Sequence, residues 1–146
     1  MEIRIYNQPY DPWVVLSTYN RQHQQLDGPC GATDVFVGWM RDHNEGDNVA
    51  TMFLEHYPGM TERELERVAQ ESVDRHQLLD LFICHRVGEV RPGEAIVIVA
   101  TYAAHRKAAF DACREVMEAL KSRVPFWKRE SVEDGERWVE KNTTGY

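Results

Sequence analysis

Two lysines lie near one another in the sequence, on either side of a proline that should end a helix. Lys121 is near the end of a run of apolar residues with helical spacing, Pro125 disfavours helix at the residue before it, and Lys128 follows in an extended segment. The two amines could share a pocket and bind a phosphate or a carboxylate as point charges. Their mutual repulsion and partial desolvation could also lower one pKa far enough to leave a neutral, nucleophilic amine.

A structural role would explain the same lysines. A cation near a helix C-terminus stabilises the exposed carbonyl groups, and a lysine at the edge of an apolar stripe can extend its amine to water. Lys121 fits both descriptions, and two lysines beside a helix end are common. The spacing alone leaves the catalytic and the structural interpretation open.

Two arginines are further candidates for anion binding. Arg106 follows His105 in the first turn of the same predicted helix, where a cation is mildly unfavourable, so we expect an anionic partner for it. Arg41 precedes the turn-like segment 42–48, and its guanidinium suits a pair of phosphate oxygens. An exposed loop charge is the alternative for Arg41.

The helix that carries most of these residues, predicted over 104–124, has one apolar stripe that should face the core. Arg106 falls within the stripe and Lys121 at its edge, where a simple amphipathic helix would place neither charge. The stripe consists of Ala109, Phe110, Cys113, Val116, Met117 and Leu120. Both charges therefore need a specific explanation.

The remaining elements are predicted from helix caps, apolar spacing and β-branched runs bounded by turn residues. The other expected helices are 11–26, which starts at Asp11-Pro12, and 59–77, with a capping box at Thr61 and Glu64. The expected strands are 2–7, 28–41, 49–57, 78–90, 94–102 and two short strands around Asp134-Gly135.

The order of these elements, β-α-ββ-α-ββ-α-ββ, predicts an α+β fold with mostly antiparallel pairing, similar to an α/β hammerhead. Segments 28–41 and 49–57 are predicted to pair as a hairpin through 42–48. Two long helices and a shorter N-terminal helix should pack against the sheet in one domain over residues 1–146.

The composition restricts the classes of partner. Among 146 residues, 17 Lys and Arg face 24 Asp and Glu, and the net charge of −7 argues against a nucleic-acid backbone as the main partner. The longest apolar run, 95–104, is about half the length of a membrane span, and residues 1–13 lack a signal-peptide pattern. We therefore expect a cytoplasmic protein that binds neither nucleic acid nor membrane.

Other common reactive groups have no supporting motif. Cys30, Cys84 and Cys113 are widely spaced, which suggests reduced thiols, and no CxxC or HxxxH pair predicts a metal site. Glycine-rich nucleotide-binding motifs and GxSxG are absent from the sequence, so we expect no cofactor. We interpret His56 and His85, near the ends of predicted strands, as structural or supporting residues.

Five segments together carry a family resemblance. They are FVGWMRDHNEGDNV, LEHYPGMTE, HRVGEVRPGE, AHRKAAF and LKSRVPFWKRE, within about residues 29–140. In this order and spacing they resemble the large, catalytic subunit of molybdopterin synthase.

The resemblance implies a sulfurtransferase that converts cyclic pyranopterin monophosphate into molybdopterin. It implies that the sulfur arrives as a thiocarboxylate on the C-terminal tail of a small ubiquitin-like partner subunit. The family assembles as a heterotetramer, with a central homodimer of large subunits and one small subunit at each end. A non-catalytic docking module for a ubiquitin-like tail is the alternative.

The family's site residues carry over onto nine positions of this chain. Lys121 is implied to handle the partner's acyl group or activate substrate, and Lys128 to anchor substrate and stabilise charge. The substrate-binding set comprises Trp39, Met40, Arg41, His105, Arg106, Lys121, Lys128, Arg129 and Glu130.

The distance between Arg106 and Lys121 along the predicted helix bears on whether one protomer can form the whole site. Arg106 and Lys121 are 15 residues apart on one predicted helix, which is about 22 Å along its axis. That separation is too large for one small pterin. If both residues serve one substrate, the His105-Arg106 end must come from one protomer and the Lys121-Lys128 end from the other.

Overall fold

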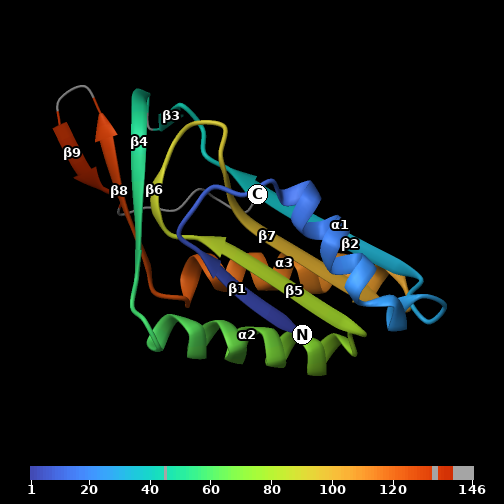
Figure 1. The fold of residues 1–146 in the computed structure, drawn as a ribbon. Coiled ribbons are helices and arrows are strands. Elements are labelled where there is room, and N and C mark those ends of the chain that lie inside the picture. Colours follow the sequence, from blue (N-terminus) through green and yellow to red (C-terminus); the bar gives the residue numbers. More distant parts are fainter. Residues whose placement is uncertain (45, 133–134, 140–146) are drawn as a thin grey trace.

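The computed structural model describes residues 1–44, 46–132 and 135–139, which form two β-sheets and three α-helices (Figure 1). The α+β class and the predominance of antiparallel pairing are confirmed. Within these described residues, no helix combines the length and the apolar character needed to cross a membrane.

The first sheet has four strands in the order β1-β5-β7-β2. These are β1 (Glu2–Tyr6), β5 (Asp80–Arg86), β7 (Ala95–Ala103) and β2 (Ala32–Trp39). Strands β1 and β5 run parallel, and the other two pairs are antiparallel. The segment predicted as one strand over 78–90 divides into two strands: Asp80–Arg86 is β5 and pairs with β7, whereas Gly88–Val90 belongs to the second sheet.

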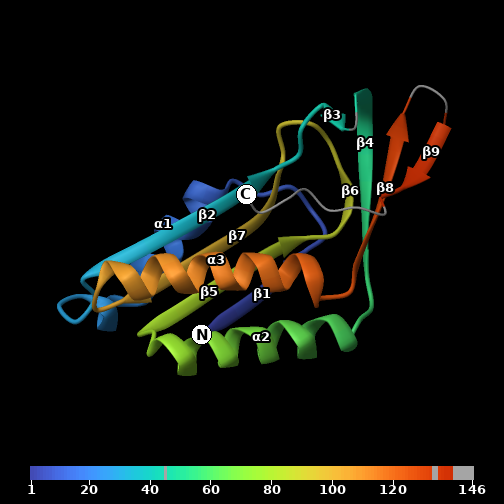
Figure 2. The same ribbon diagram turned by 180° about the vertical axis from the view of Figure 1, so that it is seen from behind.

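Helices cover both faces of this sheet. Helix α1 (Pro12–Gln22) lies on one face, whereas α2 (Met60–His76) and α3 (Arg106–Ser122) lie on the other (Figure 2). Successive side chains of β5 point to opposite faces of the sheet and so contribute to the hydrophobic core on each face. Leu81 and Ile83 pack toward α2 and α3, while Phe82 and Cys84 pack toward α1. This burial on two sides explains why the run lacks a polar face.

The second sheet projects beyond one end of the first (Figure 1). It consists of β3 (His43–Asn44), β4 (Asp47–His56), β6 (Gly88–Val90), β8 (Phe126–Val132) and β9 (Gly135–Trp138). A separate small core of Met40, Val49, Met52, Leu54 and Val90 supports it. Strands β8 and β9 pair as the sequence predicts; residues 133 and 134 between them lie outside the described residues.

The predicted hairpin between 28–41 and 49–57 is wrong. Strand β2 pairs with β7, from Ala32↔Ala103 onward, and β4 pairs with β8. The turn composition of 42–48 produces only the short β3–β4 pairing. The chain leaves the first sheet at Met40, whose side chain is buried in the second core, so strands adjacent in sequence belong to different sheets.

Helix α2 begins differently from the prediction. Its N-cap is Gly59, with φ at 84°, and the Glu62 carboxylate accepts a hydrogen bond from the Gly59 N–H. The Thr61 hydroxyl instead accepts from the Tyr57 N–H at 2.9 Å and donates to the Pro125 carbonyl at 3.1 Å. The capping box predicted at Thr61 is therefore wrong, and this buried threonine connects the start of α2 to the turn after α3.

Helix α1 is shorter than predicted. Asp11 is its N-cap, and the carboxylate accepts a hydrogen bond from the Trp13 N–H at 2.9 Å. The helix ends at Gln22, and the remainder of the predicted segment forms a 3-10 turn over Gln24–Leu26.

Candidate active site

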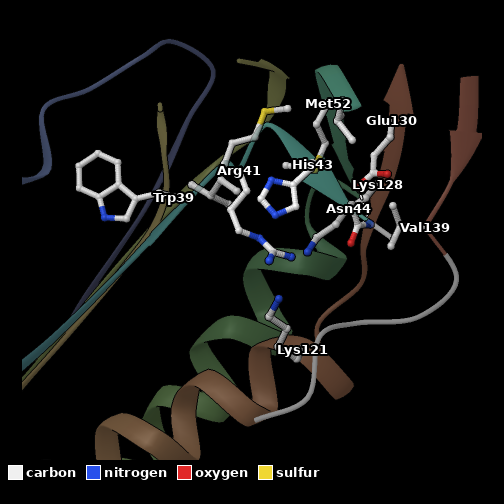
Figure 3. A pocket seen from close by; sticks show the side chains of 12 residues that line it. Trp39, Arg41, His43, Asn44, Met52, Lys121, Lys128, Glu130 and Val139 are labelled. Atoms are coloured by element: carbon white, nitrogen blue, oxygen red, sulfur yellow. Dashed lines mark hydrogen bonds between the residues drawn. The ribbon is translucent and has the colours of Figure 1, made fainter. Parts of the chain in front are cut away.

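A cavity of about 400 Å³ opens where the end of α3 meets β8 and the first sheet. Arg41, His85, Lys121 and Lys128 are its polar lining, among apolar residues that include Trp39. A smaller pocket of about 140 Å³ shares Trp39, Arg41 and both lysines (Figure 3). Three cations thus gather at one place in an acidic protein.

Lys121 and Lys128 are brought together by the turn at Pro125. Helix α3 ends at Ser122, and β8 starts at Phe126, so Lys121 projects from the last helical turn and Lys128 from the strand. Burial lowers the pKa of Lys128 to about 8, and both the charge of Lys121 and a hydrogen bond between the two amines act in the same direction. The pair can therefore present a neutral amine beside a charged one near neutral pH.

The end of β2 and the two residues that follow it contribute to the site in different ways. Arg41 and Lys121 point toward each other across the pocket (Figure 3). The Trp39 ring is 43% exposed at the edge of both pockets and lies 6.4 Å from the Trp13 ring. Met40 is buried in the second core and also lines the smaller pocket, so it anchors the segment and gives the pocket an apolar wall.

Glu130 forms a buried polar network beside Lys128. Its carboxylate accepts from Asn44 Nδ2 at 2.9 Å and from the Arg137 guanidinium at 3.2 Å, and Arg137 also pairs with Asp47 at 2.7 Å. The negative charge of Glu130 raises the pKa of Lys128, against the larger effect of burial. Asn44 lines the smaller pocket, and sequence reasoning missed it and Arg137 because neither forms a local pattern.

Arg129 is not brought into this site. Successive side chains of a strand point to opposite faces, so Arg129 lies on the face of β8 away from Lys128 and Glu130. Its guanidinium lies 5.1 Å from the Phe53 ring centroid and pairs with Glu136 at 3.4 Å.

His105 and Arg106 are also distant from the lysines within one chain. Both are exposed at the start of α3, where His105 is the N-cap and makes no side-chain capping bond. Arg106 does not lie in the buried stripe, and neither does Phe110, which is 59% exposed. The stripe prediction is wrong at these two positions. The other end of α3, with Lys121, is about 22 Å away along the axis.

His85 is a cavity residue whose position the sequence did not reveal. It is 7% exposed at the end of β5, and its ring stacks on Phe126 with centroids 3.7 Å apart. Its Nδ1 lies 2.8 Å from the Arg86 carbonyl oxygen. Burial lowers the pKa of His85 to about 3, with a smaller contribution from Lys128, so the ring is neutral.

The cysteines have the properties of packing residues. Cys84 and Cys113 are buried, and burial raises the pKa of each thiol to about 12. Cys30 is partly exposed but lines a different pocket, with His23 and Tyr102. Across the described ranges, no group of three or more His, Cys, Asp or Glu residues is arranged to hold a metal ion. No cysteine is among the described residues that line the cavity with Lys121 and Lys128.

Known proteins match this chain over nearly its whole length. A family model described as the MoaE protein matches residues 8–123. The molybdopterin synthase catalytic subunit of Pseudomonas aeruginosa is 49% identical over 140 residues, which cover 96% of this chain and 91% of that protein.

Solved structures agree. The molybdopterin biosynthesis MoaE protein from Burkholderia ambifaria MC40-6 is 44% identical, with a TM-score of 0.76 over 94% of this chain and 87% of that one. Molybdopterin synthase from Staphylococcus aureus is 27% identical, with a TM-score of 0.81 over 97% of this chain and 99% of that one. The resemblance seen in the sequence is confirmed, and the chain belongs to the MoaE protein family.

Proposed function

We propose that this chain is the catalytic subunit of a molybdopterin synthase. It acts as a sulfurtransferase that converts cyclic pyranopterin monophosphate into molybdopterin with sulfur from the C-terminal thiocarboxylate of a small ubiquitin-like subunit. The observation that carries the proposal is the amine pair, in which Lys128 has a pKa of about 8 beside Lys121 in a cavity of about 400 Å³.

The cations match the charges of the two reactants. The substrate is an anionic cyclic phosphate and the partner's tail is a second anion, so both are attracted to a local basic site in a protein of net charge −7. We assign phosphate binding to Arg41 and Lys121, whose side chains point toward each other, and pterin contact to Trp39 at the cavity edge.

The neutral amine of Lys128 has a chemical role distinct from that of the cations. Sulfur transfer from an acyl group develops negative charge on the acyl oxygen, which Lys121 and Arg41 stabilise. It also needs a proton acceptor or a nucleophile near neutral pH. We assign this role to Lys128 rather than to Lys121, to which the family resemblance gave it, because Lys128 is the amine with the lowered pKa. Glu130 keeps Lys128 in place through β8 rather than reacting itself.

We further propose that two protomers form each complete site, as a homodimer within a heterotetramer. His105 and Arg106 are exposed and too far from Lys121 in the same chain to contact one small substrate. A two-fold axis can bring them to the lysines of the other protomer at both sites. From the composition, we also propose a cytoplasmic location and one domain over residues 1–146.

Reconstitution tests the assignment. The chain is combined with a thiocarboxylated small subunit and the cyclic pterin, and the dithiolene product is measured. Product that depends on Lys128 is the expected result. Tight binding of the small subunit without product would instead favour the docking module.

A further inference from the structure

His85 contributes to the wall of the main cavity but has no part in the assignments above. Only one of its two ring nitrogens is available for a hydrogen bond with another side chain. Nδ1 lies 2.8 Å from the Arg86 carbonyl oxygen, which cannot donate, so Nδ1 carries the ring proton. Nε2 therefore carries the lone pair and is a hydrogen-bond acceptor.

The His85 imidazole, carried by β5, and the Lys128 side chain lie on the same side of β8. Side chains two residues apart in a strand share a face, so Phe126 and Lys128 point the same way. The His85 ring stacks on Phe126 with an interplanar angle of 10°, and it lines the same cavity as Lys128. The ring and the amine are thus both part of the lining of one cavity.

We propose that His85 is a positioning residue for Lys128: imidazole Nε2 accepts a hydrogen bond from the Lys128 amine, which directs the amine's lone pair into the cavity. The inference rests on the proposed function and deepens it. A neutral amine with one N–H fixed has far fewer orientations for its lone pair, and correct orientation of a reacting group has a large effect on rate. A neutral imidazole provides this without adding positive charge.

The surrounding charges keep the imidazole in this neutral state. Lys128 from β8, Lys121 from α3 and His56 from β4 all oppose its protonation, in addition to burial. Arg41 lines the cavity from the segment after β2, and the Glu130 carboxylate is directed to Asn44 and Arg137. The pKa of about 3 means that His85 remains an acceptor at every pH at which the protein is assayed.

Two amide substitutions separate the two nitrogen atoms. His85→Gln can place an amide oxygen where Nε2 lies, whereas His85→Asn can reach only the Arg86 carbonyl. If His85 positions Lys128, His85→Asn lowers kcat by about tenfold or more with little change in KM, and His85→Gln restores a large part of that loss. Loss of activity in His85→Gln with wild-type kcat in His85→Asn would overturn the inference and assign the ring to anchoring Arg86.

The pKa of Lys128 gives a second readout that needs no synthase activity. An acceptor stabilises the ammonium, so His85→Asn moves the midpoint for trace acetylation of Lys128, followed by mass spectrometry, to lower pH. His85→Gln leaves the midpoint near that of wild type. An unchanged midpoint in a folded His85→Asn protein would contradict the contact.

A measurement on the unaltered histidine avoids any doubt about folding. In protein with 15N-labelled histidine, the His85 signals should show the Nδ1–H tautomer, and Lys128→Met should shift the Nε2 resonance toward the value of a free acceptor. An Nε2 resonance unaffected by Lys128→Met would refute the proposal. If the acetylation midpoint of Lys128 and the Nε2 resonance of His85 change as expected but reconstitution gives no product, the contact between His85 and Lys128 is supported and the proposed function is contradicted.

Discussion

The lowered pKa of Lys128 should set the pH dependence of the reaction. At its ordinary pKa about 0.03% of a lysine is neutral at pH 7, whereas a pKa of about 8 gives about 10%, roughly a 300-fold increase in reactive amine. In the proposed reaction the neutral form of Lys128 is the active one, so activity should rise with pH and level off above about 8.

Two substitutions should shift the rising limb of the pH–activity profile in opposite directions. Lys121→Met removes a neighbouring positive charge while keeping an apolar chain of similar length, so the pKa of Lys128 rises and the limb moves to higher pH. Glu130→Gln removes a negative charge that favours the ammonium, so the pKa falls and the limb moves to lower pH. His85 is neutral, and Arg41 and His56 are unchanged in both variants.

Both variants are compared with wild type by product formation in the reconstituted reaction and by trace acetylation of Lys128 in the isolated chain. Labelling reports the amine directly, so it separates a shift in pKa from weakened substrate binding in Lys121→Met. An acetylation midpoint near 10.5 in wild type, or shifts of the same sign in the two variants, would refute the electrostatic account.

Three further outcomes follow from the fold and the cavity. Mixing inactive Arg106→Ala with inactive Lys121→Ala protein should restore about one quarter of wild-type activity after free exchange, because half of the dimers are hybrids with one intact site; no recovery after demonstrated exchange would exclude a shared site. Thr61→Val should lower the free energy of unfolding by about 1–3 kcal/mol, measured by urea denaturation, because it removes two buried hydrogen bonds; a midpoint equal to that of wild type would show that they contribute nothing. Alkylation of Cys84 and Cys113 at pH 8 should be far slower in the native protein than in urea, since both thiols are buried with raised pKa values; equal rates would contradict their placement.

The amine pair was predictable because it depends on local rules. A proline ends the helix by steric conflict with the residue before it, and the following residues are then extended, which places Lys128 on a strand beside the helix end. The same local rules identified Asp11 as a helix cap and the apolar character of β5 and β7. The predicted drop in one lysine pKa follows from the burial of Lys128 and, to a smaller extent, from its proximity to Lys121.

The features that the sequence did not reveal depend on contacts between distant segments. The pairing of β2 with β7 joins segments that are far apart in the sequence, from Ala32↔Ala103 onward, and the turn-like residues between β2 and β4 carry no information about it. Glu130 and Asn44 are 86 residues apart, and His85 is recognisable only when Phe126 is seen stacked on it. Arg129 was assigned from the family resemblance, and strand alternation directs it to the opposite face.

The hydrogen bond from Thr61 to the Pro125 carbonyl bears on when, during folding, the two lysines come together. It closes a loop of 64 residues, and it fixes the turn on which the spacing of Lys121 and Lys128 depends. A nascent chain that has not yet produced β8 has neither the turn nor the desolvated amine, and its lysines are ordinary ammonium groups. The lowered pKa therefore arises only on folding, and incompletely folded chains hold roughly 300-fold less neutral amine at this position at pH 7.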